Sequence, residues 1–302
     1  MGKIAFVFPG QGDQFPGMGK EWNKQYTEAA AVFAFCDELR PGTSKQCFEG
    51  SEEELKETKN TQPCLFAVEM AAFSVLREAG IRPAAVAGFS LGELAALTAA
   101  GVLGMGGGFR LVCKRGELMQ AASEETNTSM AAVMRLSEEE VVKVCGRFSH
   151  VYPVNFNCPG QITVAGLYAE MKDFAAEVKA AGGRALPLKV RGAFHTPYME
   201  KTAAIFAEEL KKVKWGLNTV PVYANRTGRP YEGDYEQLLA EQICNAVRWE
   251  DTIRHMIGTG IDTFIEVGPG RTLSNMIRKI DGGVRTYTAA ELPVLLSEVK
   301  PC

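Results

Sequence analysis

The first ninety residues alternate short apolar runs with a longer segment of helical character. KIAFVF at residues 3–8 and AAVAGF at 84–89 are apolar nearly throughout, as strands buried on both faces are. Between them, residues 61–80 carry mainly helix-forming residues, with Pro63 near the start and Gly80 at the end. Strands that alternate with helices in this way predict a parallel sheet covered by helices.

Residues 130–190 follow a different pattern. Ser137, with Glu140 three residues later, forms a capping box, which predicts the start of a helix. The segment as a whole predicts strands at 130–136, 151–157, 161–167 and 184–190 and helices at 137–148 and 168–183. The resulting order, βαββαβ, is that of a ferredoxin-like unit.

We therefore expect an α/β fold with two domains. Residues 1–125 and 193–302 would form a large α/β-hydrolase-like domain with a parallel sheet, and residues 126–192 a small ferredoxin-like domain inserted into it. In the second part of the large domain, the pattern predicts helical segments at 197–215 and 234–258, a strand at 220–225, and a strand and turn at 262–270.

The sequence AGFSLGE places a serine between two glycines, after the predicted strand 84–89 and before a segment rich in helix formers. A G-x-S-x-G motif at a strand-to-helix turn is the context of a nucleophile elbow, which would expose the oxygen of Ser90. Gly88 and Gly92 fit this turn, because a Cβ at either position would crowd the strand against the helix. The amide of Leu91 would lie at a helix N-terminus, where it could stabilise an oxyanion. A glycine-rich packing turn is the alternative interpretation.

A serine nucleophile needs a base, and three histidines are candidates. His150 lies at the end of the first predicted helix of the small domain. His255 lies in a helical run, where a partly buried structural histidine is the simpler interpretation. His195, in GAFHTPYM, stands at the junction of the two predicted domains, and this position favours it as the base.

Composition argues against several classes of function. Lys and Arg number 33 and Asp and Glu 36, so the net charge of −3 gives no electrostatic basis for binding nucleic acid or an anionic membrane. No apolar run approaches the length of a membrane span, and the first residues do not resemble a signal peptide, so we expect a cytoplasmic protein. The eight cysteines form no C-x-x-C pair and do not group with the histidines. We therefore expect free thiols and no metal site.

The chain also resembles a known family along almost its whole length. Seven motifs carry the resemblance in order: FPGQGDQFPGMG at 8–19, GFSLGE at 88–93, KRGELM at 114–119, NCPGQITVAG at 157–166, GAFHTPYM at 192–199, LLAEQICNAVRW at 238–249 and EVGPG at 266–270. Together they resemble the motifs of the malonyl-CoA:acyl carrier protein transacylases, discrete acyltransferases of fatty-acid and polyketide synthesis.

The resemblance implies transfer of a malonyl group from malonyl-CoA to the phosphopantetheine thiol of acyl carrier protein. The mechanism would be ping-pong through a seryl ester, with no bound cofactor and no metal. Ser90 would be the nucleophile and His195 the base, oriented by the main-chain carbonyl of Gln242. The backbone amides of Gln11 and Leu91 would form the oxyanion hole.

The resemblance further implies that Arg115 binds the free carboxylate of the malonyl group, which a guanidinium matches with two parallel hydrogen bonds. The alternative is a helix-surface arginine paired with Glu93 or Glu117, and we expect the neighbouring Lys114 to be such a surface charge. The remaining implied substrate-binding residues are Phe89, Phe194, Met119 and Asn157. Phe194 matches the malonyl-type pattern, whereas Phe89 departs from it, since malonyl-specific members commonly have histidine before the serine.

Two other functions fit the same motifs. An acyl hydrolase on this scaffold would differ only in resolving the acyl-enzyme with water instead of a thiol. A degenerate acyltransferase kept as a carrier-protein-binding module is the second, and the intact set of implied catalytic residues argues against it. The acidic helix of a carrier protein would meet basic residues near the cleft, for which the candidates are Lys189, Arg191, Arg271 and Arg278.

Overall fold

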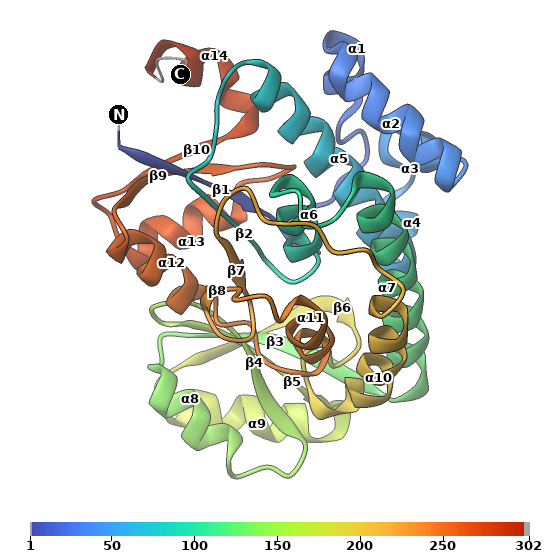
Figure 1. The fold of residues 1–302 in the computed structure, drawn as a ribbon. Coiled ribbons are helices and arrows are strands. Elements are labelled where there is room, and N and C mark those ends of the chain that lie inside the picture. The colour runs from blue at the N-terminus through green and yellow to red at the C-terminus, as the bar shows by residue number, and fades with distance from the viewer. Residues whose placement is uncertain (1, 299–302) are drawn as a thin grey trace.

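A six-stranded sheet forms the upper part of the molecule in Figure 1. The computed structural model describes residues 2–298, except the side chains of Lys189 and Arg191. The strand order is β10-β9-β1-β2-β7-β8; the strands from β10 to β7 are parallel, and β8 at the edge is antiparallel to β7. The strands are β1 (Lys3–Phe8), β2 (Ala85–Gly88), β7 (Val222–Ala224), β8 (Arg229–Pro230), β9 (Ile261–Glu266) and β10 (Arg285–Thr288). The parallel sheet expected from the sequence is confirmed.

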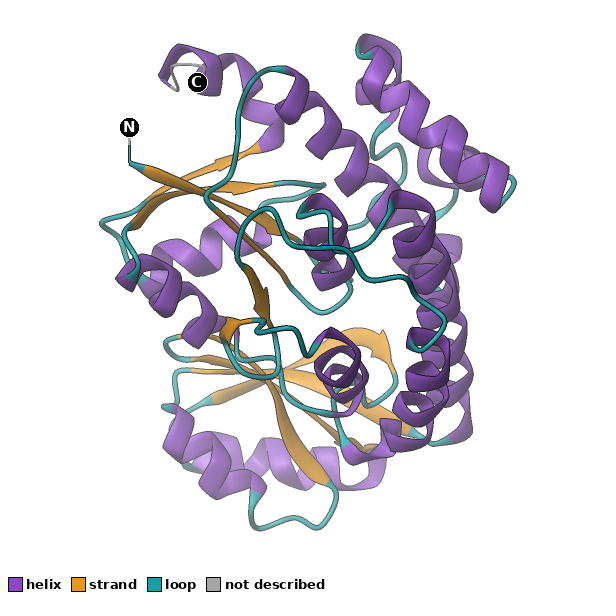
Figure 2. Ribbon diagram, in the orientation of Figure 1, coloured by secondary structure: helices purple, strands orange, loops and turns teal. Residues whose placement is uncertain are grey.

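Strand β1 shows why this sheet is buried on both faces. Phe6 and Phe8 belong to the apolar core formed with α5 and α6, whereas Ala5 and Val7 belong to a second core formed with α12 and α13. Successive side chains of a strand point to opposite faces, so an apolar run without polar alternation requires cover on both sides. Figure 2 shows helices on both sides of the sheet.

The helices of this larger part pack on the two faces of the sheet or on the helices that cover it. They are α1 (Lys20–Gln25), α2 (Thr27–Leu39), α3 (Thr43–Glu49), α4 (Glu52–Lys56), α5 (Thr58–Glu78), α6 (Gly92–Ala99), α7 (Met105–Glu125), α10 (Glu200–Leu210), α11 (Tyr235–Cys244), α12 (Trp249–Gly258), α13 (Thr272–Ile280) and α14 (Leu292–Glu298), with short 3-10 turns at Pro197–Met199 and Ala289–Glu291. Helix α5 begins three residues before the predicted start, so Pro63 lies inside the helix.

A four-stranded antiparallel sheet forms the lower part of the molecule in Figure 1, with two helices on one face. The elements are β3 (Thr128–Met134), α8 (Glu138–Cys145), β4 (Val151–Cys158), β5 (Gln161–Leu167), α9 (Tyr168–Ala180) and β6 (Arg184–Arg191), and the strand order is β4-β5-β3-β6. The capping box at Ser137 is present, with Ser137 and Glu140 each accepting from the backbone N–H of the other. The ferredoxin-like βαββαβ unit is confirmed, and the domain boundaries at 126 and 192 stay a prediction.

The single helical run predicted over 234–258 is wrong. The chain leaves α11 at Asn245 in an extended conformation and resumes as α12 at Trp249. In between, Val247 donates to the carbonyl of Val154 at 2.9 Å and accepts from the amide of Phe156 at 3.0 Å, which joins it to β4. These hydrogen bonds to a strand distant in sequence outweigh the local helical preference, and they tie the small sheet to the larger part.

Strand β2 passes into α6 through the turn that carries Ser90. Ser90 has a φ of +55°, a left-handed conformation that costs free energy for a residue with a Cβ. A Cβ added to Gly88 would lie 1.9 Å from backbone atoms of Gly92, and one added to Gly92 would lie 2.3 Å from the carbonyl oxygen of Phe8. Both glycines are therefore required by the close approach of strand and helix, as the sequence predicted.

None of the helices within residues 2–298 is long and apolar enough to cross a membrane. No group of three or more histidine, cysteine or acidic side chains in that range is arranged to hold a metal ion. The seven cysteines described are free thiols, while Cys302 lies outside the described residues.

We expect Gly88→Ala to lower the free energy of unfolding by about 3 kcal/mol or more, because backbone atoms, which cannot move aside, block the new methyl group. Gly107→Ala is the matched control. Gly107 lies in α7 with no atom within 4 Å of an added Cβ, and alanine is favoured over glycine in a helix by up to about 1 kcal/mol. Urea denaturation of both variants measures the difference. Equal stability of the two variants would contradict the argument.

Candidate active site

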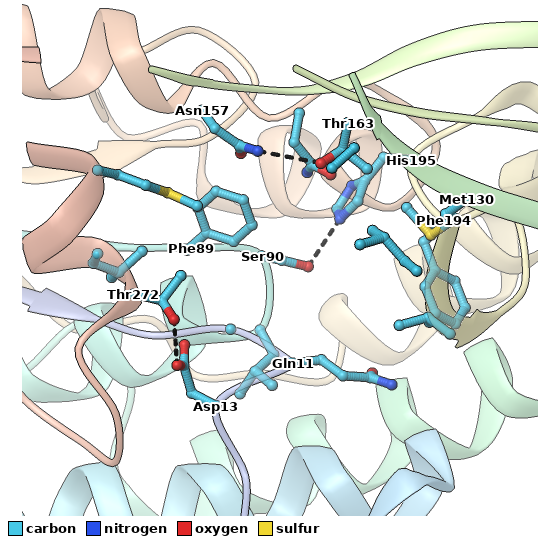
Figure 3. Close-up of a pocket in the computed structure, with 18 of the residues that line it drawn as sticks. Gln11, Asp13, Phe89, Ser90, Met130, Asn157, Thr163, Phe194, His195 and Thr272 are labelled. Atoms are coloured by element: carbon cyan, nitrogen blue, oxygen red, sulfur yellow. Dashed lines mark hydrogen bonds between the residues drawn. The ribbon is translucent and has the colours of Figure 1, made fainter. Parts of the chain in front are cut away.

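A pocket of about 270 Å³ opens between the end of the larger sheet and the small sheet. Figure 3 shows Ser90 at its centre, facing His195, with Gln11 below and Asn157 above. Nine of the ten residues that the sequence implicated line this pocket: Gln11, Phe89, Ser90, Leu91, Arg115, Met119, Asn157, Phe194 and His195. The tenth, Gln242, is buried directly behind His195 and Arg115.

Ser90, His195 and Gln242 form a hydrogen-bonded series. The Oγ atom of Ser90 lies 2.9 Å from Nε2 of His195, and Nδ1 of His195 lies 2.7 Å from the main-chain carbonyl oxygen of Gln242. Because a carbonyl oxygen can only accept, Nδ1 must carry the proton. In the neutral ring, Nε2 then presents its lone pair to the serine hydroxyl. The histidine is thus poised to accept the serine proton without any carboxylate in contact.

The environment of His195 keeps its ring neutral. Burial, and secondarily the charge of Arg115, lower the pKa of His195 to about 4. The hydrogen bond to the Gln242 carbonyl opposes this shift, because it favours the protonated ring. At pH 7 the imidazole is therefore neutral, with Nε2 free of a proton and able to act as a base.

Gln11 and Leu91, whose backbone amides the resemblance assigns to the oxyanion hole, both line the pocket. Leu91 is the N-cap residue of α6, and Gln11 lies in the loop after β1. A Cβ on the adjacent Gly10 would lie 2.7 Å from the carbonyl oxygen of Phe89, so this loop packs directly on the elbow. Neither the Gln11 nor the Leu91 amide donates a hydrogen bond to another residue between 2 and 298. Both donors are therefore available to an oxyanion formed beside Ser90.

Arg115 is a buried cation whose hydrogen-bond partners are all neutral. Its side chain is 1% exposed; Nη1 donates to Oε1 of Gln62 at 2.8 Å, and Nη2 donates to Oε1 of Gln242 at 2.7 Å and to Oγ of Ser90 at 3.1 Å. Burial lowers the pKa of Arg115 to about 10, which leaves it charged at pH 7. No carboxylate of the described residues lies within ion-pair distance of this guanidinium.

The alternative interpretation of Arg115 as a surface arginine is therefore wrong. Its neighbour Lys114 does lie on the surface, 3.9 Å from Glu117. Arg115 lies on the face of α7 that packs against α5, and there it donates to Gln62. Lys114, the preceding residue of the same helix, points toward solvent instead.

The walls of the pocket differ in polarity. Phe89 packs edge to face against Trp249, with ring centroids 5.5 Å apart, and makes one wall apolar. Phe194 and Met119 also line the pocket, and both are buried. On the small-sheet side, Nδ2 of Asn157 donates to Oγ1 of Thr163 at 3.2 Å, and Oδ1 of Asn157 has no partner within the described part of the chain.

The other two histidines lie away from the pocket. His150 is on the surface, with Nδ1 2.6 Å from a carboxylate oxygen of Glu170. His255 in α12 lies 3.0 Å from the hydroxyl of Tyr223, consistent with the structural role expected for it. Of the basic residues considered for carrier binding, Arg271 is exposed and pairs with Glu291 at 3.1 Å, and Arg278 is exposed. The side chains of Lys189 and Arg191 lie outside the described part of the structure.

Sequence reasoning missed two buried polar residues that support the site, Gln62 and Asn225, and considered a third, Glu93, only as a surface partner of Arg115. Gln62 holds Arg115, as described above. Asn225, which follows β7, accepts from the amide of Ser90 at 2.6 Å and donates to the carbonyl of Gly88 at 2.5 Å, so it fastens the elbow. Glu93 accepts from the side chain of Gln242 at 2.8 Å. The one local signal was Glu93, a carboxylate in the first turn of the otherwise apolar helix GELAALTA.

Comparison with known proteins agrees with the family resemblance that the seven sequence motifs carry. The family model for the acyl transferase domain matches residues 5–292. The malonyl CoA-acyl carrier protein transacylase of Bacillus subtilis is 38% identical over 300 residues, which cover 96% of this chain and 94% of that protein. The chain belongs to this transacylase family.

Solved structures of other transacylases confirm the fold. The malonyl CoA-acyl carrier protein transacylase of Clostridium perfringens superposes with a TM-score of 0.94 at 32% identity, covering 98% of this chain and 97% of that one. A malonyl-transacylase solved in complex with a type II polyketide synthase acyl carrier protein superposes equally well, with a TM-score of 0.94 at 33% identity over 98% of this chain and all of that one.

We expect a nuclear magnetic resonance titration of the His195 ring to give a pKa of about 4. In Arg115→Gln, the pKa should rise because a nearby positive charge is removed, yet it should stay below 6.5, since burial is the larger cause. A pKa near 6.5 in the unaltered protein, or no rise in the variant, would refute this account of the histidine.

Proposed function

We propose that this protein transfers a malonyl group from malonyl-CoA to the phosphopantetheine thiol of acyl carrier protein. The observation that carries the proposal is the charged guanidinium of Arg115, buried among neutral acceptors 3.1 Å from the nucleophilic oxygen of Ser90. A buried cation without a contacting anion is a site for a substrate anion, and malonyl carries a carboxylate two carbons from the reacting carbonyl carbon.

In the first half-reaction, Oγ of Ser90 attacks the thioester carbonyl while Nε2 of His195 takes the hydroxyl proton. The oxyanion that forms accepts hydrogen bonds from the amides of Gln11 and Leu91. The C–S bond then breaks, the sulfur of CoA leaves with the proton returned by His195, and the malonyl group remains as an ester on Ser90.

In the second half-reaction, the thiol of the carrier's phosphopantetheine takes the place of CoA. His195 accepts the thiol proton, the sulfur attacks the ester carbonyl, and the same two amides stabilise the oxyanion. Collapse breaks the C–Oγ bond, and His195 returns the proton to Ser90. The two thiols use the site in turn, which gives ping-pong kinetics. All groups in these steps belong to the protein or its two substrates, and malonyl-CoA enters as substrate.

Arg115 distinguishes malonyl from neutral acyl groups in this proposal. Gln62 and Gln242 hold the guanidinium by neutral amide oxygens, which fix its direction without cancelling its charge. The hydrogen bond from Nη2 to Ser90 is the one that a carboxylate would replace, since acylation removes the free hydroxyl. A carboxylate paired there is held by charge-assisted hydrogen bonds in a site shielded from water.

The pocket also suits the rest of the substrate. Phe89 and Asn157 both line the pocket (Figure 3), so it offers an apolar surface for the methyl groups of a pantetheine arm and a polar side chain near its amide groups. The complex of a related malonyl-transacylase with an acyl carrier protein supports acyl carrier protein as the second substrate. Arg271, the neighbour of the pocket-lining Thr272, is an exposed cation that we propose for its docking. We place the reaction in the cytoplasm, without nucleic acid or membrane partners.

Ser90→Ala should abolish formation of the acyl-enzyme, because among the described pocket-lining residues the hydroxyl hydrogen-bonded to His195 is that of Ser90. Intact-protein mass spectrometry after addition of malonyl-CoA should show a malonyl adduct on the unaltered protein and none on Ser90→Ala. Addition of carrier protein should then move the adduct to the carrier. An adduct on Ser90→Ala would contradict the assignment of the nucleophile. Loss of the adduct to water at the same rate with and without carrier would identify a hydrolase instead.

Arg115→Ala should lower kcat/KM for malonyl-CoA relative to acetyl-CoA by roughly 30- to 1,000-fold, corresponding to a buried charge pair of about 2–4 kcal/mol. Lys114→Ala is the matched control, since it removes an exposed cation from the same helix and should leave the ratio unchanged. Arg115→Lys should fall between, because it keeps the charge but not the forked geometry. Equal losses for the two substrates in Arg115→Ala would show that the residue has only a structural role.

A further inference from the structure

Glu93 is a buried residue whose carboxylate makes no hydrogen bond to Ser90 or His195 within the described part of the chain, although its backbone amide donates to the carbonyl oxygen of Ser90 at 3.2 Å. It is the second residue of α6 and has no exposed surface. Its Oε1 atom accepts from the hydroxyl of Tyr231 and from the amide of Asn225, and its Oε2 atom accepts from Nε2 of Gln242 at 2.8 Å. A carboxylate in the interior costs free energy that an apolar side chain would not, so its partners indicate why it is there.

The hydrogen bonds of the Gln242 side chain depend on which side its amide oxygen and its amide nitrogen occupy. The nitrogen donates to two oxygens, the main-chain carbonyl of Ser90 at 2.7 Å and Glu93. The oxygen accepts from Nη2 of Arg115 at 2.7 Å. If the amide were reversed, its oxygen would face two acceptors and its nitrogen would face a guanidinium, which can only donate.

We propose that Glu93 is a positioning residue that fixes the orientation of the Gln242 amide and, through it, directs the Arg115 guanidinium toward the carboxylate of the malonyl group. Burial raises the pKa of Glu93 to about 7. The ionised form, which prevails above that pH, can only accept, so it holds the amide nitrogen on its side and leaves the amide oxygen for Arg115. This inference rests on the proposed function, because it concerns the binding of the acyl carboxylate.

The same arrangement keeps the guanidinium available. The side-chain amide of Gln242 lies between the two charged groups. It accepts from Arg115 and donates to Glu93, so the two charges do not pair directly. A direct ion pair would occupy the hydrogen atoms that the substrate needs. Glu93 instead stabilises Arg115 from a distance, and burial of Glu93 is partly offset by that charge and by its three hydrogen bonds.

The test compares two variants that each disturb this carboxylate. The glutamine of Glu93→Gln has nearly the same shape as glutamate. If its oxygen stays toward Tyr231 and Asn225, its NH₂ group faces the NH₂ group of Gln242, so that two donors oppose each other. Tyr231→Phe removes one hydrogen bond from Glu93 and leaves its contact with Gln242 in place. We expect Glu93→Gln to reduce the malonyl to acetyl ratio of kcat/KM by about tenfold or more. Tyr231→Phe should keep the ratio within about threefold, although it is expected to lower the midpoint of thermal unfolding.

Failure of the inference about Glu93 and failure of the proposed function give different results. An unchanged ratio in Glu93→Gln, or equal reductions in both variants, would overturn the inference while leaving malonyl transfer by the unaltered protein intact. Absence of malonyl transfer by the unaltered protein would instead overturn the proposed function.

Should Glu93→Gln fail to fold, the unaltered protein provides a second measurement. The side-chain amide protons of Gln242 should exchange with solvent far more slowly than those of the exposed Gln237, in the free protein and in the malonyl-enzyme alike. Equal exchange rates for the two amides would overturn the inference, because Gln242 would then not be held by Glu93.

Discussion

The guanidinium of Arg115 constrains the surrounding structure more than any other group in the pocket. A cation buried in an apolar interior must be met by acceptors, and here the nearest are the amide oxygens of Gln62 and Gln242 and the hydroxyl of Ser90. The polar core around it, which includes Glu93, follows from the need to orient those acceptors. In the proposed function, the carboxylate of the substrate balances the charge of this buried guanidinium.

The catalytic groups are held by backbone geometry as much as by side chains. Ser90 and His195 both adopt left-handed conformations, with φ of +55° and +63°. The histidine is oriented by a main-chain carbonyl, so no anion raises its pKa, and it stays neutral beside Arg115. A neutral base next to a fixed cation suits a reaction in which the acyl group carries its own negative charge.

Sequence reasoning succeeded where local pattern determines structure. The flanks of GFSLG identified the elbow, and Ser137 with Glu140 identified the start of α8. It assigned no elements to the four short helices between residues 20 and 56, and it missed the break after Asn245, which depends on hydrogen bonds between Val247 and β4. The acceptors that hold Arg115 could not be predicted from local pattern either, because Gln62 and Gln242 lie 53 and 127 positions away along the chain. The resemblance supplied the role of Arg115; its burial came only from the fold.

The account is tested most directly by varying the substrate instead of the protein. The CoA thioester of malonic acid monoamide has nearly the shape of malonyl-CoA, but it replaces the carboxylate with a neutral amide. Rapid-mixing measurement of Ser90 acylation should show malonyl-CoA reacting at least about 30-fold faster in kcat/KM, corresponding to about 2 kcal/mol from the charge pair with Arg115. Acylation at equal rates by the two thioesters would contradict the claim that the buried guanidinium is reserved for the acyl carboxylate.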